Sequence, residues 1–297
     1  MQRFNEKLVV ISGGASGMGA LTAKRVVEEG GTAITLDIND NLGQEVANEI
    51  GDKCEFVHAD VTKPDSWNDL EKYLSERFNK VTSVINAAGI SEPATIEDET
   101  FDHWNRTHSI NGTSVFLGCQ FGVKAMKDNG GSIVNFSSSL ATRPKPFVIA
   151  YNYSKAGVLA ITRTVALHCA EMGYKIRCNS VQPGAINTPM MQRYIDAAED
   201  PKQQLADFAA THPMNRVGDP DEYEDGNNED PVIYVVRGGT YRLKNDSDKN
   251  PLRIGKSPGD KTNPKGLEKN GITGDDGTVE WKVPLDAPGE YYYYSGD

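Results

Sequence analysis

The chain has 297 residues, with 42 acidic against 31 basic side chains, so its formal net charge is −11 at pH 7. This balance argues against nucleic acid and anionic membrane surfaces as partners. No apolar run approaches the ~20 residues of a membrane span, and the first seven residues lack the shape of a signal peptide. We therefore expect a cytoplasmic protein with one large or two smaller domains.

The chain opens with a predicted strand, a glycine loop and a helix. An apolar, β-rich run over 7–11 leads directly into Ser12-Gly-Gly-Ala-Ser-Gly-Met-Gly19. Glycines in such a loop allow a tight turn and close approach to a pyrophosphate, which sits on the N-terminus of the following helix. Glycines also occur in ordinary turns, so the prediction depends on strand, loop and helix following in this order.

A second predicted strand, 32–36, ends in Asp37. An acid about 20 residues past the glycines is where a ribose 2′-hydroxyl is held. Asp37 would repel a 2′-phosphate, and the glycine loop offers Ser16 but no Arg or Lys. The sequence therefore predicts NAD as the cofactor, not NADP.

Strands and helices alternate through the middle of the chain, which predicts an α/β fold with a doubly wound parallel sheet. Further strands are expected at 81–85, 131–136 and 175–181. Ser138 follows the second of these at its carboxyl end, the edge where ligands bind in such sheets.

Tyr151 and Lys155 lie four residues apart on a predicted helix, so phenol and ammonium share a face. A neighbouring cation should lower the tyrosine pKa from its usual ~10. Ser138 would then polarise a substrate carbonyl while Tyr151 transfers the proton. A surface Tyr and Lys on an ordinary helix would give the same spacing by chance, so the hypothesis depends on the other motifs.

These motifs, in this order, resemble the short-chain dehydrogenase/reductase family over residues 1–222. The resemblance implies a Rossmann-like fold and four catalytic residues. Tyr151 would be the general acid/base, Lys155 its activator, Ser138 the carbonyl polariser and Asn111 the anchor of a water in the proton relay. Lys155 would also hold the nicotinamide ribose.

The cofactor contacts implied by the resemblance come from the glycine loop, the ends of the next strands, the catalytic pair and the turn after Val181. Among them, residues 60–61 would hold the adenine, 86–89 would shape the floor of the cleft, and 183–188 would position the carboxamide. The full set is Gly13, Ser16, Gly17, Met18, Gly19, Asp37, Ile38, Asp60, Val61, Asn86, Ala87, Ala88, Gly89, Tyr151, Lys155, Pro183, Gly184, Ile186 and Thr188.

Residues 185–215 are expected to act either as a mobile flap over the substrate or as an amphipathic helix packed on the core, and both readings stay open. Their apolar side chains favour a neutral, hydrophobic secondary alcohol or ketone as the substrate. These side chains are Met190, Met191, Tyr194, Ile195 and Phe208.

The family pattern breaks after Glu222, because the expected last helix and last strand are missing. An acidic linker over 223–231 is followed by an all-β segment over 232–297. Strand-like runs are predicted at 232–236, 240–243, 252–254, 278–283 and 291–294. The run 232–236 would either pair with the free edge of the parallel sheet or belong to an independently folded module.

The segment 232–297 resembles a truncated cupredoxin-like, plastocyanin-type β-module, through the stretches 236–242, 250–254 and 287–295. Asn250 and Ser295 stand where a copper site would have His and Cys, and no His, Cys or Met follows Met214. A blue-copper site requires those donors, so we predict that the module binds no copper.

The four cysteines show no metal-ligand spacing, so we predict no metal site and buried free thiols rather than disulfides.

Two classes of function remain. One is an NAD-dependent oxidoreductase acting on a small secondary alcohol or ketone. The other is a non-catalytic chimera or relic that binds NAD, or acts through its β-module, without turnover. Members of the family that the chain resembles are often homo-oligomers, but the missing elements commonly contribute to that interface, so the oligomeric state stays open.

Overall fold

The structure is a computed structural model that describes residues 2–212, 215–220 and four strands of the C-terminal segment. The chain divides into two compact units, Met1–Asp221 and Glu222–Asp297. All four cysteines are free and buried, as predicted. None of the described helices is both long and apolar enough to cross a membrane.

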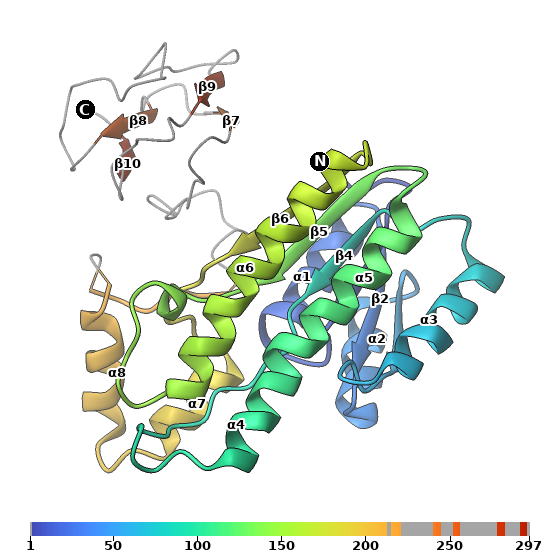
Figure 1. Ribbon diagram of the computed structural model, residues 1–297. Helices are drawn as coiled ribbons and strands as arrows, with labels where there is room; N and C mark the ends of the chain where they lie inside the picture. The colour runs from blue at the N-terminus through green and yellow to red at the C-terminus, as the bar shows by residue number, and fades with distance from the viewer. Residues whose placement is uncertain are drawn as a thin grey trace. The chain divides into compact units, whose positions relative to one another are not determined.

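The first unit is built on a six-stranded parallel sheet with the strand order β3-β2-β1-β4-β5-β6 (Figure 1). The chain proceeds outward from β1 to β3 and then returns to place β4 on the other side of β1. This reversal is the topological switch point at which doubly wound sheets bind ligands, so the predicted α/β fold with a Rossmann-like parallel sheet is confirmed for the first unit. The strands are β1 Leu8–Ser12, β2 Thr32–Asp37, β3 Cys54–His58, β4 Ser83–Asn86, β5 Gly131–Phe136 and β6 Ile176–Val181.

Helices cover both faces of the sheet, because the side chains of its buried strands alternate between two cores. On β1, Leu8 and Val10 face a core shared with α3, α5 and α6, whereas Val9 and Ile11 face one shared with α1 and α2. The α-helices of this unit are α1 Gly17–Glu28, α2 Asp40–Ile50, α3 Pro64–Arg77, α4 Phe101–His108, α5 Ser114–Met126, α6 Ile149–Glu171, α7 Pro189–Asp196 and α8 Pro201–Ala210.

Strand β4 begins two residues later than the sequence predicted. The hydroxyl of Thr82 accepts a hydrogen bond from the Leu8 N–H at 3.1 Å and donates one to the Leu8 carbonyl at 2.9 Å. The Thr82 backbone N–H also donates to the Leu8 carbonyl at 3.0 Å, so side chain and backbone together bind β1 at this point, and the regular ladder starts at Ser83.

The second unit contains two antiparallel strand pairs: β7 Thr240–Lys244 with β9 Thr278–Lys282, and β8 Leu252–Gly255 with β10 Tyr292–Ser295. Four of the five predicted runs therefore form strands. The run 232–236, its pairing with the sheet edge, the linker 223–231 and Asn250 lie outside the described residues.

Candidate active site

The glycine loop is pressed against the turn that follows β4. Gly13 has φ +71°, and a Cβ there would lie 2.7 Å from the backbone nitrogen of Ala88. A Cβ on Gly19 would lie 2.1 Å from the Gly13 carbonyl oxygen. Only glycine fits at these two positions, which leaves bare backbone at the switch point, where a dinucleotide requires close approach.

Helix α1 begins directly behind this loop with an N-terminus suited to an anion. Ser16 is its N-cap but accepts no capping hydrogen bond with its side chain, and the first turn carries no acidic residue. The positive end of the helix dipole and its first N–H groups therefore remain available to a phosphate. Ser16, Gly17, Met18 and Gly19 all lie at this end of the helix.

Asp37 ends β2 beside the glycine loop. Its Oδ2 accepts a hydrogen bond from the Ala15 N–H at 3.3 Å, and its Oδ1 accepts from Ile38 and Asn39 at 2.8 and 3.2 Å. The side chain of Ile38 is 67% exposed. The carboxylate is thus oriented by backbone donors next to the loop, where the sequence placed a ribose contact.

Asp60 and Val61 follow β3, and the Ala59 N–H donates to the Asp37 carbonyl at 2.9 Å. Burial works to raise the pKa of Asp60, but hydrogen bonds from the backbone and hydroxyl of Thr62 outweigh it and lower that pKa. Val61 is buried. The predicted adenine-side residues thus lie at adjoining carboxyl ends of β2 and β3.

The turn after β4 lines the site with backbone atoms, because its Asn86 side chain points into the core. The Asn86 side chain is 1% exposed and donates to Asn135 at 2.8 Å, so it joins β4 to β5 inside the core. The Ala88 N–H donates to the Ser12 hydroxyl at 3.3 Å. A Cβ on Gly89 would lie 3.3 Å from the Lys155 ammonium nitrogen, so this turn lies directly against the predicted catalytic lysine.

Ser138, Tyr151 and Lys155 converge, as the sequence predicted. Ser138 follows β5 and interacts through its hydroxyl with Tyr151, one turn before Lys155 on α6. The Lys155 Nζ donates to the Phe136 carbonyl at 2.8 Å and lies 5.6 Å from the centroid of the Tyr151 ring. The Ser137 hydroxyl donates to the Lys155 carbonyl at 2.8 Å, which fixes α6 against the end of β5.

The pKa of Tyr151 is raised, which corrects the predicted lowering. Burial is the main cause; the Ser138 hydrogen bond opposes it, and nearby Tyr194 raises the pKa further. Burial also lowers the pKa of Lys155 to about 8. Removal of both groups from water disfavours their charged forms, and for Tyr151 this effect exceeds that of the Ser138 hydrogen bond. At neutral pH the phenol is therefore a proton donor.

Asn111 lies in a π-helical turn, η1 (Ser109–Thr113), between α4 and α5. Its Oδ1 accepts from the Ile90 N–H at 2.8 Å, and its Nδ2 donates to the Ile90 carbonyl at 2.9 Å and to the Ser154 hydroxyl at 3.0 Å. The side chain thus ties the loop after β4 to α6. Its role in a proton relay stays a prediction; π-helical turns of this kind recur at functional sites.

The turn after β6 begins at Pro183, whose carbonyl accepts from the Ser139 N–H at 2.9 Å. Thr188 caps α7 by accepting from the Met191 N–H. A Cβ on Gly17 would lie 3.7 Å from the Thr188 Cβ. The predicted contacts in 183–188, which include Gly184 and Ile186, therefore begin beside the loop that carries Ser138 and end beside the glycine loop.

Helix α7 shows the packing expected of an amphipathic helix in residues 185–215, whereas the role of this segment as a flap over the substrate stays a prediction; we call α7 and α8 the flap below. Met191 and Ile195 are 7% exposed and pack inward. Tyr194, expected to be an apolar contact, forms a 2.8 Å hydrogen bond with the hydroxyl of Ser91 in the loop after β4, and its ring contacts Phe208 edge-on. No pattern in the sequence points to Ser91, because an apolar pattern does not reveal the polar contact through which α7 docks on this loop.

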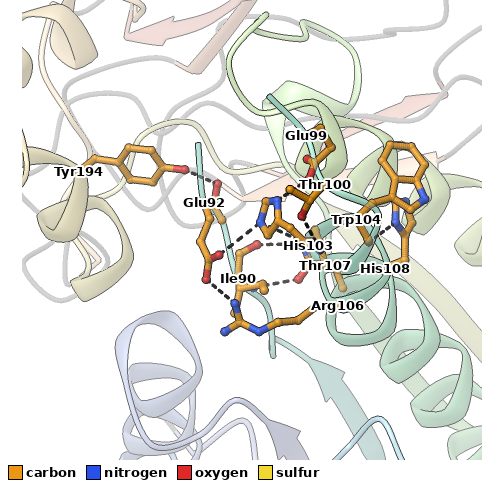
Figure 2. A network of polar contacts seen from close by, with 12 residues as sticks. Ile90, Glu92, Glu99, Thr100, His103, Trp104, Arg106, Thr107, His108 and Tyr194 are labelled. Atoms are coloured by element: carbon orange, nitrogen blue, oxygen red, sulfur yellow. Dashed lines mark hydrogen bonds and ion pairs between the residues drawn. The ribbon is translucent and has the colours of Figure 1, made fainter. Parts of the chain in front are cut away.

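The loop that carries Ser91 is braced on α4 by charged groups (Figure 2). Glu92 pairs with Arg106 at 2.7 Å and with His103 at 3.3 Å, and His103 also contacts Glu99 at 2.6 Å. Figure 2 shows Tyr194 reaching this loop from the opposite side. The wall on which the flap docks is thus held in place independently of the flap.

Known proteins match the first unit. A family model described as enoyl-(acyl carrier protein) reductase matches residues 13–225. The 3-beta-hydroxysteroid dehydrogenase of Comamonas testosteroni is 37% identical over 216 residues, which cover 73% of this chain and 84% of that protein. The NADP-dependent (R)-specific alcohol dehydrogenase of Lentilactobacillus kefiri is 34% identical over 224 residues, covering 74% and 87%.

A cyclopentanol dehydrogenase of Comamonas testosteroni is 35% identical over 209 residues, covering 69% of this chain and 83% of that protein. Among solved structures, the ligand-free aldohexose dehydrogenase of Thermoplasma acidophilum superposes with a TM-score of 0.67 at 28% identity, covering 74% of this chain and 85% of that one. These comparisons lend no support to the cupredoxin-like resemblance of the C-terminal segment. The ordered motifs, the six-stranded sheet and these matches agree: over residues 13–225 the chain belongs to the short-chain dehydrogenase/reductase family of oxidoreductases.

Proposed function

We propose that the first unit is an NAD-dependent dehydrogenase that interconverts neutral, hydrophobic or cyclic secondary alcohols and their ketones. The observation that carries this proposal is the convergence of Ser138, Tyr151 and Lys155 next to the glycine loop. The names of the hydroxysteroid and cyclopentanol dehydrogenases support the substrate class.

The residues present fit a dinucleotide cofactor. Gly13 and Gly19 leave bare backbone at the switch point, α1 presents an uncapped N-terminus, and Gly89 leaves room beside Lys155. The bound nicotinamide would supply the hydride acceptor for oxidation or the hydride donor for reduction. Asp37 supports NAD, because its carboxylate beside the loop would repel a 2′-phosphate.

In the proposed mechanism the catalytic residues transfer one proton between the Tyr151 hydroxyl and the substrate oxygen. In ketone reduction, the Ser138 hydroxyl would hold the carbonyl oxygen while the Tyr151 hydroxyl donates its proton to that oxygen as negative charge develops. In alcohol oxidation, Tyr151 would take the proton back. Lys155, fixed at the Phe136 carbonyl, would stabilise the phenolate through its charge, and Asn111 would hold the neighbouring loop and α6 in register.

We also propose the domain division made from the sequence: a dehydrogenase unit over 1–222, a linker over 223–231 and a metal-free, cupredoxin-like β-segment over 232–297. The support is the change in composition after Glu222 and the two antiparallel strand pairs of the second unit. In this proposal the C-terminal segment takes no part in the redox chemistry.

Spectrophotometry and binding together test the dehydrogenase proposal. NAD⁺ with cyclopentanol, cyclohexanol and a hydroxysteroid should produce NADH absorbance with at least one alcohol. Tyr151→Phe should abolish this turnover and leave NAD⁺ affinity nearly unchanged, since the ring still packs and only the proton-transferring oxygen is lost. NAD⁺ binding without turnover on the whole panel would favour the non-catalytic alternative. Most of the wild-type rate remaining in Tyr151→Phe would refute the mechanism.

A further inference from the structure

His212, just after the end of α8, is held by hydrogen bonds at both ring nitrogens. Nδ1 lies 3.0 Å from the carbonyl oxygen of Phe208, and Nε2 lies 2.9 Å from the backbone nitrogen of Ala185. A backbone N–H can only donate, so Nε2 must be the unprotonated acceptor. The proton therefore sits on Nδ1, which faces the Phe208 carbonyl and, also at 3.0 Å, the hydroxyl of Thr211. This arrangement requires a neutral imidazole in one tautomer.

The imidazole joins the flap to the turn that follows β6. Phe208 belongs to α8, whereas Ala185 belongs to the turn 183–188. The ring lies so close to Gly184 that a Cβ there would be 2.2 Å from Nε2. The same turn is held through its backbone by Gly218, which donates to the Ala185 carbonyl at 2.9 Å and accepts from the Asn187 N–H at 2.8 Å.

The contacts of His212 continue to the opposite wall of the site. Phe208, whose carbonyl His212 binds, also packs edge-on against Tyr194 with ring centroids 6.3 Å apart. Tyr194 bonds Ser91 in the loop after β4. An unbroken series of contacts therefore runs from the turn 183–188 through His212 and the flap to the loop beside the catalytic centre.

We propose that His212 is a positioning residue: its neutral imidazole fastens α8 to the turn 183–188 and so holds that turn against the nicotinamide end of the cofactor. The inference rests on the proposed function, because it takes the turn as the contact for the carboxamide. In this proposal the His212 side chain has two effects. It positions the turn that contacts the nicotinamide, and it keeps the flap that carries Tyr194 in its docked position.

Two substitutions separate the two hydrogen bonds of the ring. The amide oxygen of His212→Gln reaches as far as Nε2 and can accept from the Ala185 N–H. The amide of His212→Asn reaches only as far as Nδ1, so it can bind Phe208 but leaves the Ala185 N–H without its acceptor. The pair is matched in polarity and charge and differs in reach.

Binding of NAD⁺ and of ADP-ribose to the full chain provides the readout. ADP-ribose shares the adenine end of the cofactor and lacks the nicotinamide ring. His212→Asn should bind NAD⁺ about five- to tenfold more weakly, as expected for one lost hydrogen bond, with unchanged affinity for ADP-ribose. His212→Gln should bind both ligands nearly as the wild type does. The KM for NAD⁺ should rise in His212→Asn and recover in His212→Gln.

Three results would overturn the inference: unchanged NAD⁺ affinity in His212→Asn, an equal loss of both ligands in that variant, or no recovery in His212→Gln. An equal loss of both ligands would indicate a general structural defect. A wild-type protein that binds neither ligand would instead refute the proposed function, and the inference with it.

Discussion

Replacing Lys155 with methionine should stabilise the folded protein at neutral pH while abolishing turnover. The ammonium is buried, at 4% exposure, and burial lowers its pKa from 10.5 to about 8. The folded state therefore carries this charge at a cost that the unfolded chain does not have. Methionine has a similar length and no charge, so it fills the same space without that cost.

The pKa difference gives the magnitude. At about 1.4 kcal/mol per pH unit, lowering the pKa to about 8 corresponds to roughly 3 kcal/mol of destabilisation by the charged group. The hydrogen bond to the Phe136 carbonyl offsets about 1 kcal/mol of it. Lys155→Met should therefore gain about 2 kcal/mol at pH 7, or about 4–8 °C in Tm for a unit of this size.

The gain should depend on pH in a defined direction. The folded pKa lies below the unfolded pKa, so the unfolded chain binds more protons between about pH 8 and 10.5, and wild-type stability rises with pH across that window. The advantage of Lys155→Met should be complete below pH 8 and should vanish near pH 10.5. Thermal unfolding of both proteins at pH 7 and pH 10 measures this.

Lys124 provides the matched control, since it is exposed on α5 and its ammonium keeps its hydration on folding. Lys124→Met should leave the Tm unchanged at both pH values. A Lys155→Met protein that melts below the wild type at pH 7 would refute the argument, because the buried charge would then be net stabilising. A gain that is the same at both pH values would also refute it.

Three further predictions concern rate and specificity. Burial raises the pKa of Tyr151 and lowers that of Lys155 to about 8, so the rate of alcohol oxidation, which requires the phenolate and the charged ammonium together, should rise up to about pH 8 and level off above it; a rate that keeps rising steeply above pH 8 would contradict this. Asp37→Ala combined with Ile38→Arg should shift the ratio of kcat/KM values from NAD⁺ towards NADP⁺ by removing repulsion and adding a phosphate partner; a wild type that already prefers NADP⁺ would disprove the argument from Asp37. Tyr194→Phe should raise the KM for the alcohol about two- to tenfold by deleting the hydrogen bond to Ser91, and Ser91→Ala added to it should have little further effect; fully additive losses would show that the two hydroxyls do not act as a pair.

The sequence by itself determined five of the six strands of the parallel sheet, all but β3, and the proximity of Tyr151 and Lys155, for local physical reasons. Buried parallel strands appear as short apolar runs, and each of the first-unit strands predicted from them is present in the sheet. Tyr151 and Lys155 converge because a helix brings residues four apart to one face. Gly13 and Gly19 are required by backbone contacts that the spacing of the loop already implied.

Only the tertiary structure decided the electrostatics and the docking of the flap. The pKa of Tyr151 depends on how completely the site excludes water, and no spacing of Tyr and Lys encodes that quantity. Likewise, Ser91 and Tyr194 are 103 residues apart, and Ala185 and His212 are 27 apart. Their hydrogen bonds form because the loops after β4 and β6 lie next to the flap in the folded chain. A sequence pattern indicates which face of an element is buried, but it does not indicate which distant side chain that face contacts.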